Sequence, residues 1–231
     1  MLTLRAFTSM LHAGVLTGLF TLTAMFAPLV AHADGPTPSG APVSSYILGD
    51  SIVYGLHTDQ LAAKLQQKLG GSARLSYDVG RSITTPGSQI KQSAMESVAR
   101  DKAFIAKASI IIVALGTNQI EASFAQSQQR LMQTLKALAP QAKYYWIDIG
   151  ATLATQVPGW NARNQIIYDN ASVLGYTVIS RYKAIFGPLA NPLNITPGQN
   201  FPGRVSEPGY GEPGNVHGFN AELSQAILSA L

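Results

Sequence analysis

One serine of this sequence stands where an apolar run gives way to a helical pattern. The apolar run 46–48 leads directly into Gly49-Asp50-Ser51, and helical periodicity begins at Val53. A serine between the carboxyl end of a strand and the start of a helix has free helix N–H groups beside it. Such a serine can act as a nucleophile, because those donors can bind the oxyanion that its attack creates. The alternative interpretation is that Ser51 is only the N-cap of the helix, a common role for serine.

Three further residues of suitable type lie at other strand ends or before the last helix. Gly80 follows the second predicted strand, Asn118 follows the third, and His217 precedes the C-terminal helix. Taken singly, each has an ordinary structural interpretation as a turn glycine, a helix N-cap and a surface histidine. His57 lies about two helical turns beyond Ser51, and we expect it on the helix surface.

These residues must be positioned by strands and helices that alternate along the chain. The clearest strand is 110–115, which is apolar on both faces, as in a central parallel strand covered by helices. Apolar periodicity predicts further strands over 43–48, 73–79, 144–149 and 176–179, and helices over 53–69, 88–99, 101–107, 124–138, 161–174 and 219–231. This alternation predicts an α/β fold with a parallel sheet between two layers of helices. In such a sheet, ligands bind beyond the carboxyl ends of the strands.

Four short blocks, in this order, resemble the sequence blocks of the SGNH hydrolases, also called the GDSL esterase superfamily: Gly49-Asp50-Ser51, Val79-Gly80, Gly116-Thr117-Asn118 and Val216-His217. The resemblance extends from residue 46 to the C-terminus. It implies a three-layer, flavodoxin-like α/β sandwich with a five-stranded parallel sheet.

The resemblance also implies a role for each residue of these blocks. Ser51 would be the nucleophile, and His217 would take its proton and later return it to the leaving alcohol. The oxyanion hole would consist of the N–H groups of Ser51 and Gly80 together with the side-chain amide of Asn118. Glycine suits position 80 because the bare backbone lets a substrate approach closely. Asp50 is interpreted as structural, bonding the backbone of the turn.

One position departs from the family pattern. An aspartate usually precedes the histidine by three residues, and Gly214 occupies that position here. Glu212 could orient His217 instead, Asp148 could approach from the end of the fourth strand, or a Ser–His dyad could act without an acid. We favour Glu212 or the dyad over Asp148. A non-catalytic relative of the family also fits this departure.

Arg81 directly follows the glycine that would contribute to the oxyanion hole. Its ordinary interpretation is a solvated charge in a turn. The more specific hypothesis is a substrate-binding residue that attracts an anionic ester.

The composition is that of one folded domain, with 46% hydrophobic residues, 12% charged residues and no cysteine. Residues 1–33 are predicted to be a signal peptide, because Arg5 precedes an apolar stretch that ends in Ala31-His32-Ala33, a small-x-small cleavage pattern. A membrane anchor is the alternative. Residues 34–42, which are rich in Pro and Gly, are expected to be a linker, and 43–231 a single catalytic domain.

The sequence therefore predicts an exported serine esterase, periplasmic or extracellular, that hydrolyses O-acyl esters, most simply short acyl or acetyl esters, through a Ser51–His217 acyl-enzyme. An O-acyltransferase acting on a saccharide and a non-catalytic binding module are the alternatives. The expected partner is an ester substrate, either a small molecule or a saccharide. The formal net charge of +4 gives no case for nucleic acid, and no cofactor, metal or stable membrane insertion after cleavage is expected. The oligomeric state is left open.

Overall fold

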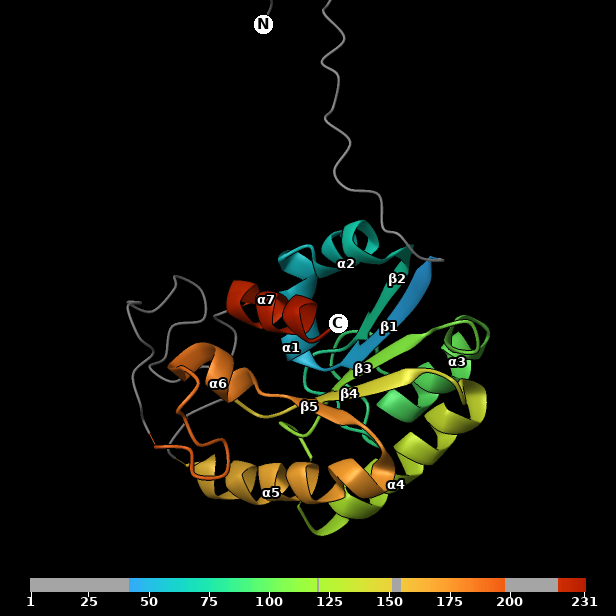
Figure 1. Cartoon of the computed structure of the whole chain (residues 1–231). Coiled ribbons are helices and arrows are strands. Elements are labelled where there is room, and N and C mark those ends of the chain that lie inside the picture. Colours follow the sequence, from blue (N-terminus) through green and yellow to red (C-terminus); the bar gives the residue numbers. More distant parts are fainter. Residues whose placement is uncertain (1–41, 120, 151–154, 198–219) are drawn as a thin grey trace, which may run out of the picture. The chain divides into compact units, whose positions relative to one another are not determined.

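The computed structural model describes residues 42–119, 121–150, 155–197 and 220–231. Its centre is a sheet of five parallel strands in the order β2-β1-β3-β4-β5 (Figure 1). The strands are β1 (Val43–Gly49), β2 (Gly70–Tyr77), β3 (Ile110–Ala114), β4 (Lys143–Ile147) and β5 (Thr177–Ile179). This order is that of the flavodoxin-like sandwich, which confirms the predicted fold class.

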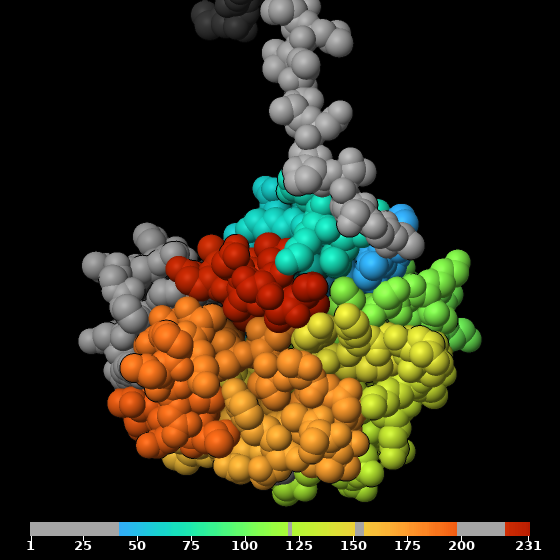
Figure 2. All heavy atoms as spheres, viewed as in Figure 1, coloured from blue at the N-terminus to red at the C-terminus, as the bar shows by residue number. Residues whose placement is uncertain are grey.

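Helices cover both faces of the sheet. They are α1 (Ser51–Thr58), α2 (Leu61–Leu69), α3 (Ala94–Ile105), α4 (Glu121–Leu138), α5 (Val157–Leu174), α6 (Arg181–Phe186) and α7 (Asn220–Ala230). Helices α3, α4 and α5 lie on one face, and α1, α2 and α7 lie on the other (Figure 1). Figure 2 shows α7 packed along α2 on the second face. No helix among the described residues combines the length and the apolar character needed to cross a bilayer.

Two hydrophobic cores meet at the central strand β3, whose five residues are all buried. Ile112 points into the core beneath α1, α2 and α7, whereas Ile111 and Val113 point into the core beneath α3, α4 and α5. This alternation follows from the two-residue period of a strand. Burial on both faces explains why the strand reads as an uninterrupted apolar run.

The predicted helix over 53–69 is two helices in the structure. Gln60 adopts a left-handed conformation, with φ of 58°, between α1 and α2. Thr58 donates its hydroxyl to the carbonyl of Gly55 over 2.6 Å, and the Nζ of Lys64 bonds Asp59 at 2.7 Å. The apolar residues 61, 65 and 69 all lie in α2, after the break, so their spacing gives no sign of it.

The two helices predicted over 88–99 and 101–107 are instead the single helix α3. It starts with a capping box, in which Ser93 accepts from the Glu96 N–H and the Glu96 carboxylate accepts from the Ser93 N–H. The box satisfies two N–H groups that would otherwise lack partners at the helix start. The short helix α6 follows β5 directly, at a place where no helix was predicted.

Candidate active site

Ser51 is the first residue of α1 and lies directly after β1. The N-cap of α1 is Asp50, whose Oδ1 accepts a hydrogen bond from the N–H of Ile52 at 2.9 Å. The capping role considered for Ser51 therefore belongs to its neighbour, and Asp50 bonds the turn backbone as expected. Asp50 also donates its own N–H to the carbonyl of Ala114 at 3.3 Å, which ties the turn to the end of β3.

Gly49 allows this turn to lie close to the rest of the fold. A Cβ at this position would overlap the side chain of Val53 and come within 2.9 Å of the Ala114 carbonyl oxygen. Only glycine permits both approaches. The sharp strand-to-helix junction at Ser51 thus depends on the residue two positions before it.

Gly80 lies in the loop that follows β2 and has a φ of 78°. A Cβ built on Gly80 would have no atom of the described residues within 4 Å, so the described part of the chain leaves the space beside this backbone open. The carboxylate of Asp78 shapes the loop by accepting from the N–H groups of Gln89, at 2.9 Å, and Gln92, at 3.2 Å. Burial acts to raise the pKa of Asp78, but the backbone donors outweigh it and lower that pKa.

Asn118 joins the Ser51 turn to the Gly80 loop. Its Nδ2 donates to Oδ2 of Asp50 at 3.1 Å and to the carbonyl oxygen of Arg81 at 3.3 Å. Both partners are acceptors, so they determine which end of the amide faces them. The three segments predicted to supply oxyanion donors are therefore in hydrogen-bonded contact at the carboxyl ends of β1, β2 and β3.

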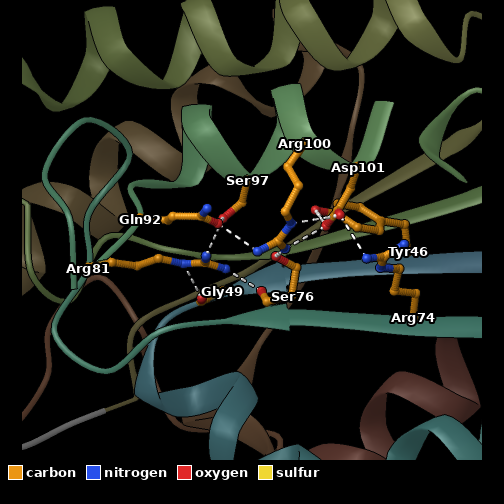
Figure 3. Close-up of polar contacts among 9 residues, drawn as sticks. All are labelled: Tyr46, Gly49, Arg74, Ser76, Arg81, Gln92, Ser97, Arg100 and Asp101. Carbon is orange, nitrogen blue, oxygen red and sulfur yellow. Dashed lines mark hydrogen bonds and ion pairs between the residues drawn. The ribbon is translucent and has the colours of Figure 1, made fainter. Parts of the chain in front are cut away.

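Arg81 is placed differently from both sequence interpretations. Its side chain is 1% exposed, so it is not a solvated turn charge. Its Nε donates to the carbonyl of Gly49 at 2.6 Å, its Nη1 to Oγ of Ser97 at 2.8 Å, and its Nη2 to the carbonyl of Ser76 (Figure 3). The proposed attraction of an anionic ester by direct contact is corrected accordingly, because these donors already bind acceptors inside the protein.

No family model matches this chain, and no curated protein matches it by sequence.

Solved structures with the same arrangement do exist. A family two carbohydrate esterase from Clostridium thermocellum in complex with cellohexaose matches with a TM-score of 0.53 and 13% identity, over 84% of this chain and 65% of that one. A putative lipolytic protein of the G-D-S-L family from Desulfitobacterium hafniense matches with a TM-score of 0.56 and 10% identity, over 82% and 99%. The periplasmic domain of a lipopolysaccharide acetyltransferase from Salmonella ser. Paratyphi A matches with a TM-score of 0.50 and 13% identity, over 82% and 84%.

The chain has an SGNH hydrolase-like fold. The chain spans less than two thirds of the length of the carbohydrate esterase. Within the SGNH-like fold, the Ser, Gly and Asn blocks occupy the carboxyl ends of the first three strands. The His block and Glu212 fall in 198–219, outside the described residues.

Two carboxylates are buried at the same edge of the SGNH-like sheet. Asp50 is fully buried, and burial raises its pKa to about 6 even though the Ile52 N–H and the charges of Arg181 and Arg81 oppose that rise. Asp148 follows β4, and burial raises its pKa to about 6 as well. A small cavity of about 10 Å³ lies between Asp148, Arg181 and the end of β3, with room for roughly one water.

Asp148 is already engaged by the elements around it. Its Oδ1 accepts from the N–H of Tyr182 at 3.1 Å, and its Oδ2 accepts from the hydroxyl of Tyr168 at 3.0 Å. These bonds hold the start of α6 and the middle of α5 against the end of β4. The ranking of Asp148 below Glu212 as an orienting acid stays a prediction, because His217 and Glu212 lie outside the described residues.

Sequence reasoning missed the two contacts that organise the site, which are the Asp50–Asn118 bond and the buried guanidinium of Arg81. The first joins residues 68 positions apart. No local pattern marks such a pair. For the buried guanidinium, the sequence gives one signal, which is that Arg81 directly follows Gly80, the glycine of the second block.

Proposed function

We propose that this chain is a serine esterase that hydrolyses O-acyl esters through an acyl-enzyme on Ser51. The observation that carries the proposal is the amide of Asn118, which bonds Asp50 on one side and the Arg81 carbonyl on the other. That amide brings the start of α1, the Gly80 loop and the end of β3 to one place. A carbonyl held there would meet a hydroxyl and three N–H donors.

The reaction begins when Ser51 Oγ attacks the ester carbonyl carbon and His217 accepts the hydroxyl proton. The carbonyl oxygen then becomes an oxyanion that receives hydrogen bonds from the N–H groups of Ser51 and Gly80 and from Asn118. Each such donor is worth about 3 kcal/mol of transition-state stabilisation. The C–O bond breaks as His217 gives the proton to the leaving alcohol, and water repeats the sequence to release the acid.

Asn118 has two amide hydrogens, and both point to protein acceptors in the unliganded chain. A hydrogen bond to a carboxylate is stronger than one to a neutral carbonyl. The 3.1 Å bond to Asp50 is therefore the one that persists, and the 3.3 Å bond to the Arg81 carbonyl is the one that an oxyanion replaces. In this scheme the carboxylate of Asp50 holds the side-chain amide of Asn118, the third donor, in position.

The proposed approach of His217 to Ser51 is supported by the described residues that follow it in the chain. Helix α7 begins at Asn220, and the Asn220 side chain packs directly against Gly55 in α1. Three residues span at most about 11 Å. A Glu212 carboxylate or a backbone group is proposed to orient the imidazole.

The substrate class proposed is a short acyl ester of a saccharide, met outside the cytoplasm after removal of residues 1–33. Two solved structures of similar fold support this choice, since one is a carbohydrate esterase bound to cellohexaose and one is a periplasmic acetyltransferase domain. The acetyltransferase also keeps acyl transfer to a saccharide hydroxyl as the second candidate.

A fluorophosphonate probe tests the proposal. Wild-type protein and the control Ser229→Ala, which removes an exposed hydroxyl on α7, should be labelled, and Ser51→Ala and His217→Ala should not. Failure to label wild type would favour the binding module. Hydrolysis of p-nitrophenyl acetate with and without an added acceptor alcohol separates esterase from transferase, because only a transferase yields mainly the new ester.

A further inference from the structure

Arg81 is a buried cation with an unusual set of partners. The acceptors described for its guanidinium are two main-chain carbonyls and one hydroxyl, and none is a carboxylate. Burying a charge is costly unless its hydrogen bonds are satisfied and its charge is balanced. Burial lowers the pKa of Arg81 to about 10, partly offset by Tyr46, Asp50 and Asp78, so the group remains charged at neutral pH.

The other arginines of this network are balanced differently. Arg74 and Arg100 both contact the carboxylate of Asp101, at 2.9 Å and 2.8 Å, and Tyr46 donates its hydroxyl to the same group (Figure 3). Their side chains are 46% and 38% exposed. That end of the network is an ordinary, partly solvated ion cluster beside α3. At the other end of the network, the side chain of Arg81 is buried and donates mainly to main-chain carbonyls.

The side chain of Arg81 joins the ends of two strands. Its Nε binds the carbonyl of Gly49 at the end of β1, and its Nη2 binds the carbonyl of Ser76 near the end of β2. Its Nη1 binds Ser97 on α3, which ties both strands to a helix. The guanidinium therefore fixes the position of Gly49, two residues before Ser51.

The main chain of Arg81 contacts the other two donor segments. Its nitrogen is covalently joined to Gly80, and its own N–H donates to the Asp78 carbonyl at 3.3 Å, which closes the turn around Gly80. Its carbonyl accepts from Asn118. One residue thus touches all three segments from which oxyanion donors are proposed.

We propose that Arg81 is the positioning residue of the oxyanion hole, setting the Gly80 N–H and the Asn118 amide relative to Ser51. This inference rests on the proposed function. Arginine suits the task because its planar fork binds several acceptors at fixed angles, which the single ammonium of lysine cannot do. Misplacing reacting groups by about 1 Å can cost on the order of 10²-fold in rate.

The kinetic test compares Arg81→Lys and Arg81→Gln with Arg74→Gln, a matched change at an arginine of the same network that touches no donor segment. We expect both Arg81 variants to lower kcat for p-nitrophenyl acetate by about 10²-fold with KM changed by less than about threefold. Arg74→Gln should stay within about twofold of wild type. A core variant, Ile105→Val, provides a control that lowers stability on α3 without touching Arg81.

Amide hydrogen exchange supplies a second measurement that does not need activity. In folded Arg81→Lys, the amides of Gly80 to Ile83 should exchange at least about tenfold faster than in wild type, and those in Ile105→Val should not. If Arg81→Gln does not fold, the same measurements are made on Arg81→Lys and on Ser97→Ala, which removes the hydroxyl that accepts from Arg81 Nη1. Wild-type kcat in folded Arg81 variants, or unchanged exchange over Gly80 to Ile83, would overturn the inference. An unlabelled wild type would refute the esterase alone, and the exchange result would still decide the positioning role.

Discussion

Replacement of Gly80 by alanine separates backbone strain from loss of an oxyanion donor. The φ of 78° lies in the left-handed region, where an L-residue costs about 1–2 kcal/mol. Among residues 42–119, 121–150, 155–197 and 220–231, no atom lies within 4 Å of the added methyl, so no clash with them increases this cost. The lower entropy of the unfolded alanine chain returns about 0.4–1 kcal/mol. The net loss of unfolding free energy should therefore be about 1 kcal/mol.

Gly175→Ala is the matched control. Gly175 has a φ of 61° at the C-cap of α5, and its added methyl would meet only the flexible end of Lys136, at 2.6 Å from Nζ. We expect a similar loss of about 1 kcal/mol in urea unfolding. Only Gly80→Ala should lose ester hydrolysis, by about 10²-fold to 10³-fold in kcat, because its methyl enters the space assigned to the substrate and disturbs one donor.

Two results would refute this reasoning. Equal activity of the two alanine variants would show that the Gly80 N–H is not a donor of the oxyanion hole. A stability loss for Gly80→Ala several times that of Gly175→Ala would show that the space beside the backbone is not open.

Three further predictions concern other residues of the described structure. Burial raises the pKa of Asp148 from 3.8 to about 6, so its contribution to stability is full below about pH 3.8 and is lost as the pH rises through 6. As the pH rises from 4 to 7, the stability of Asp148→Asn in urea unfolding should therefore increase relative to wild type by about 2 kcal/mol, and a difference independent of pH would contradict the burial of this charge. Asn118→Asp should lower both stability and kcat more than Asn118→Ala, because a second carboxylate would face Asp50 and the Arg81 carbonyl with no donor between them. Thermal unfolding and hydrolysis rates test this order, and a milder effect of the aspartate would count against it. Gln60→Gly should stabilise the chain by about 1 kcal/mol, because Gln60 has a φ of 58° between α1 and α2 and glycine adopts this conformation without strain. A lower midpoint of urea unfolding for this variant would show that the glutamine side chain compensates for the strain.

The parts of the fold that the sequence predicted are those with a local signal. The buried strand β3 is a continuous apolar run, and the helix stops at Gly70 and Gly175 are glycines in left-handed conformations. The break at Gln60 has no such signal, because glutamine rarely adopts a positive φ and the apolar residues of α1 and α2 enter the same hydrophobic core. The start of the single helix α3 does have a local signal, because Ser93 and Glu96 stand at the spacing of a capping box.

The site divides in the same way. The positions of Ser51, Gly80 and Asn118 at strand ends follow from periodicity and from the family blocks, because the carboxyl ends of parallel strands share one edge. The burial of Arg81 does not follow, since its three acceptors come from Gly49, Ser76 and Ser97 on three different elements. An arginine after a turn glycine is ordinarily solvated, and only the packed structure distinguishes this one.

The strand order explains why these contacts converge between β1 and β3. The chain passes from β1 to β2 on one side and from β3 to β4 and β5 on the other, so the connections after β1 and β3 lead in opposite directions at this switch point, where ligands bind in open parallel sheets. Asp50 follows β1 and Asn118 follows β3, and the hydrogen bond between their side chains joins the two sides.

The buried charges at this edge form a linked set. Arg81 and Arg181 both favour the ionised form of Asp50, and Arg181 is in turn influenced by Asp50 and Asp148. Two carboxylates and two guanidinium groups therefore balance one another in a buried region. In such surroundings a fixed dipole acts far more strongly on a developing charge than it would in water. A fold that needed only stability could replace these groups by apolar residues at little cost. Their arrangement around the start of α1 supports the proposal that this edge of the sheet stabilises an oxyanion.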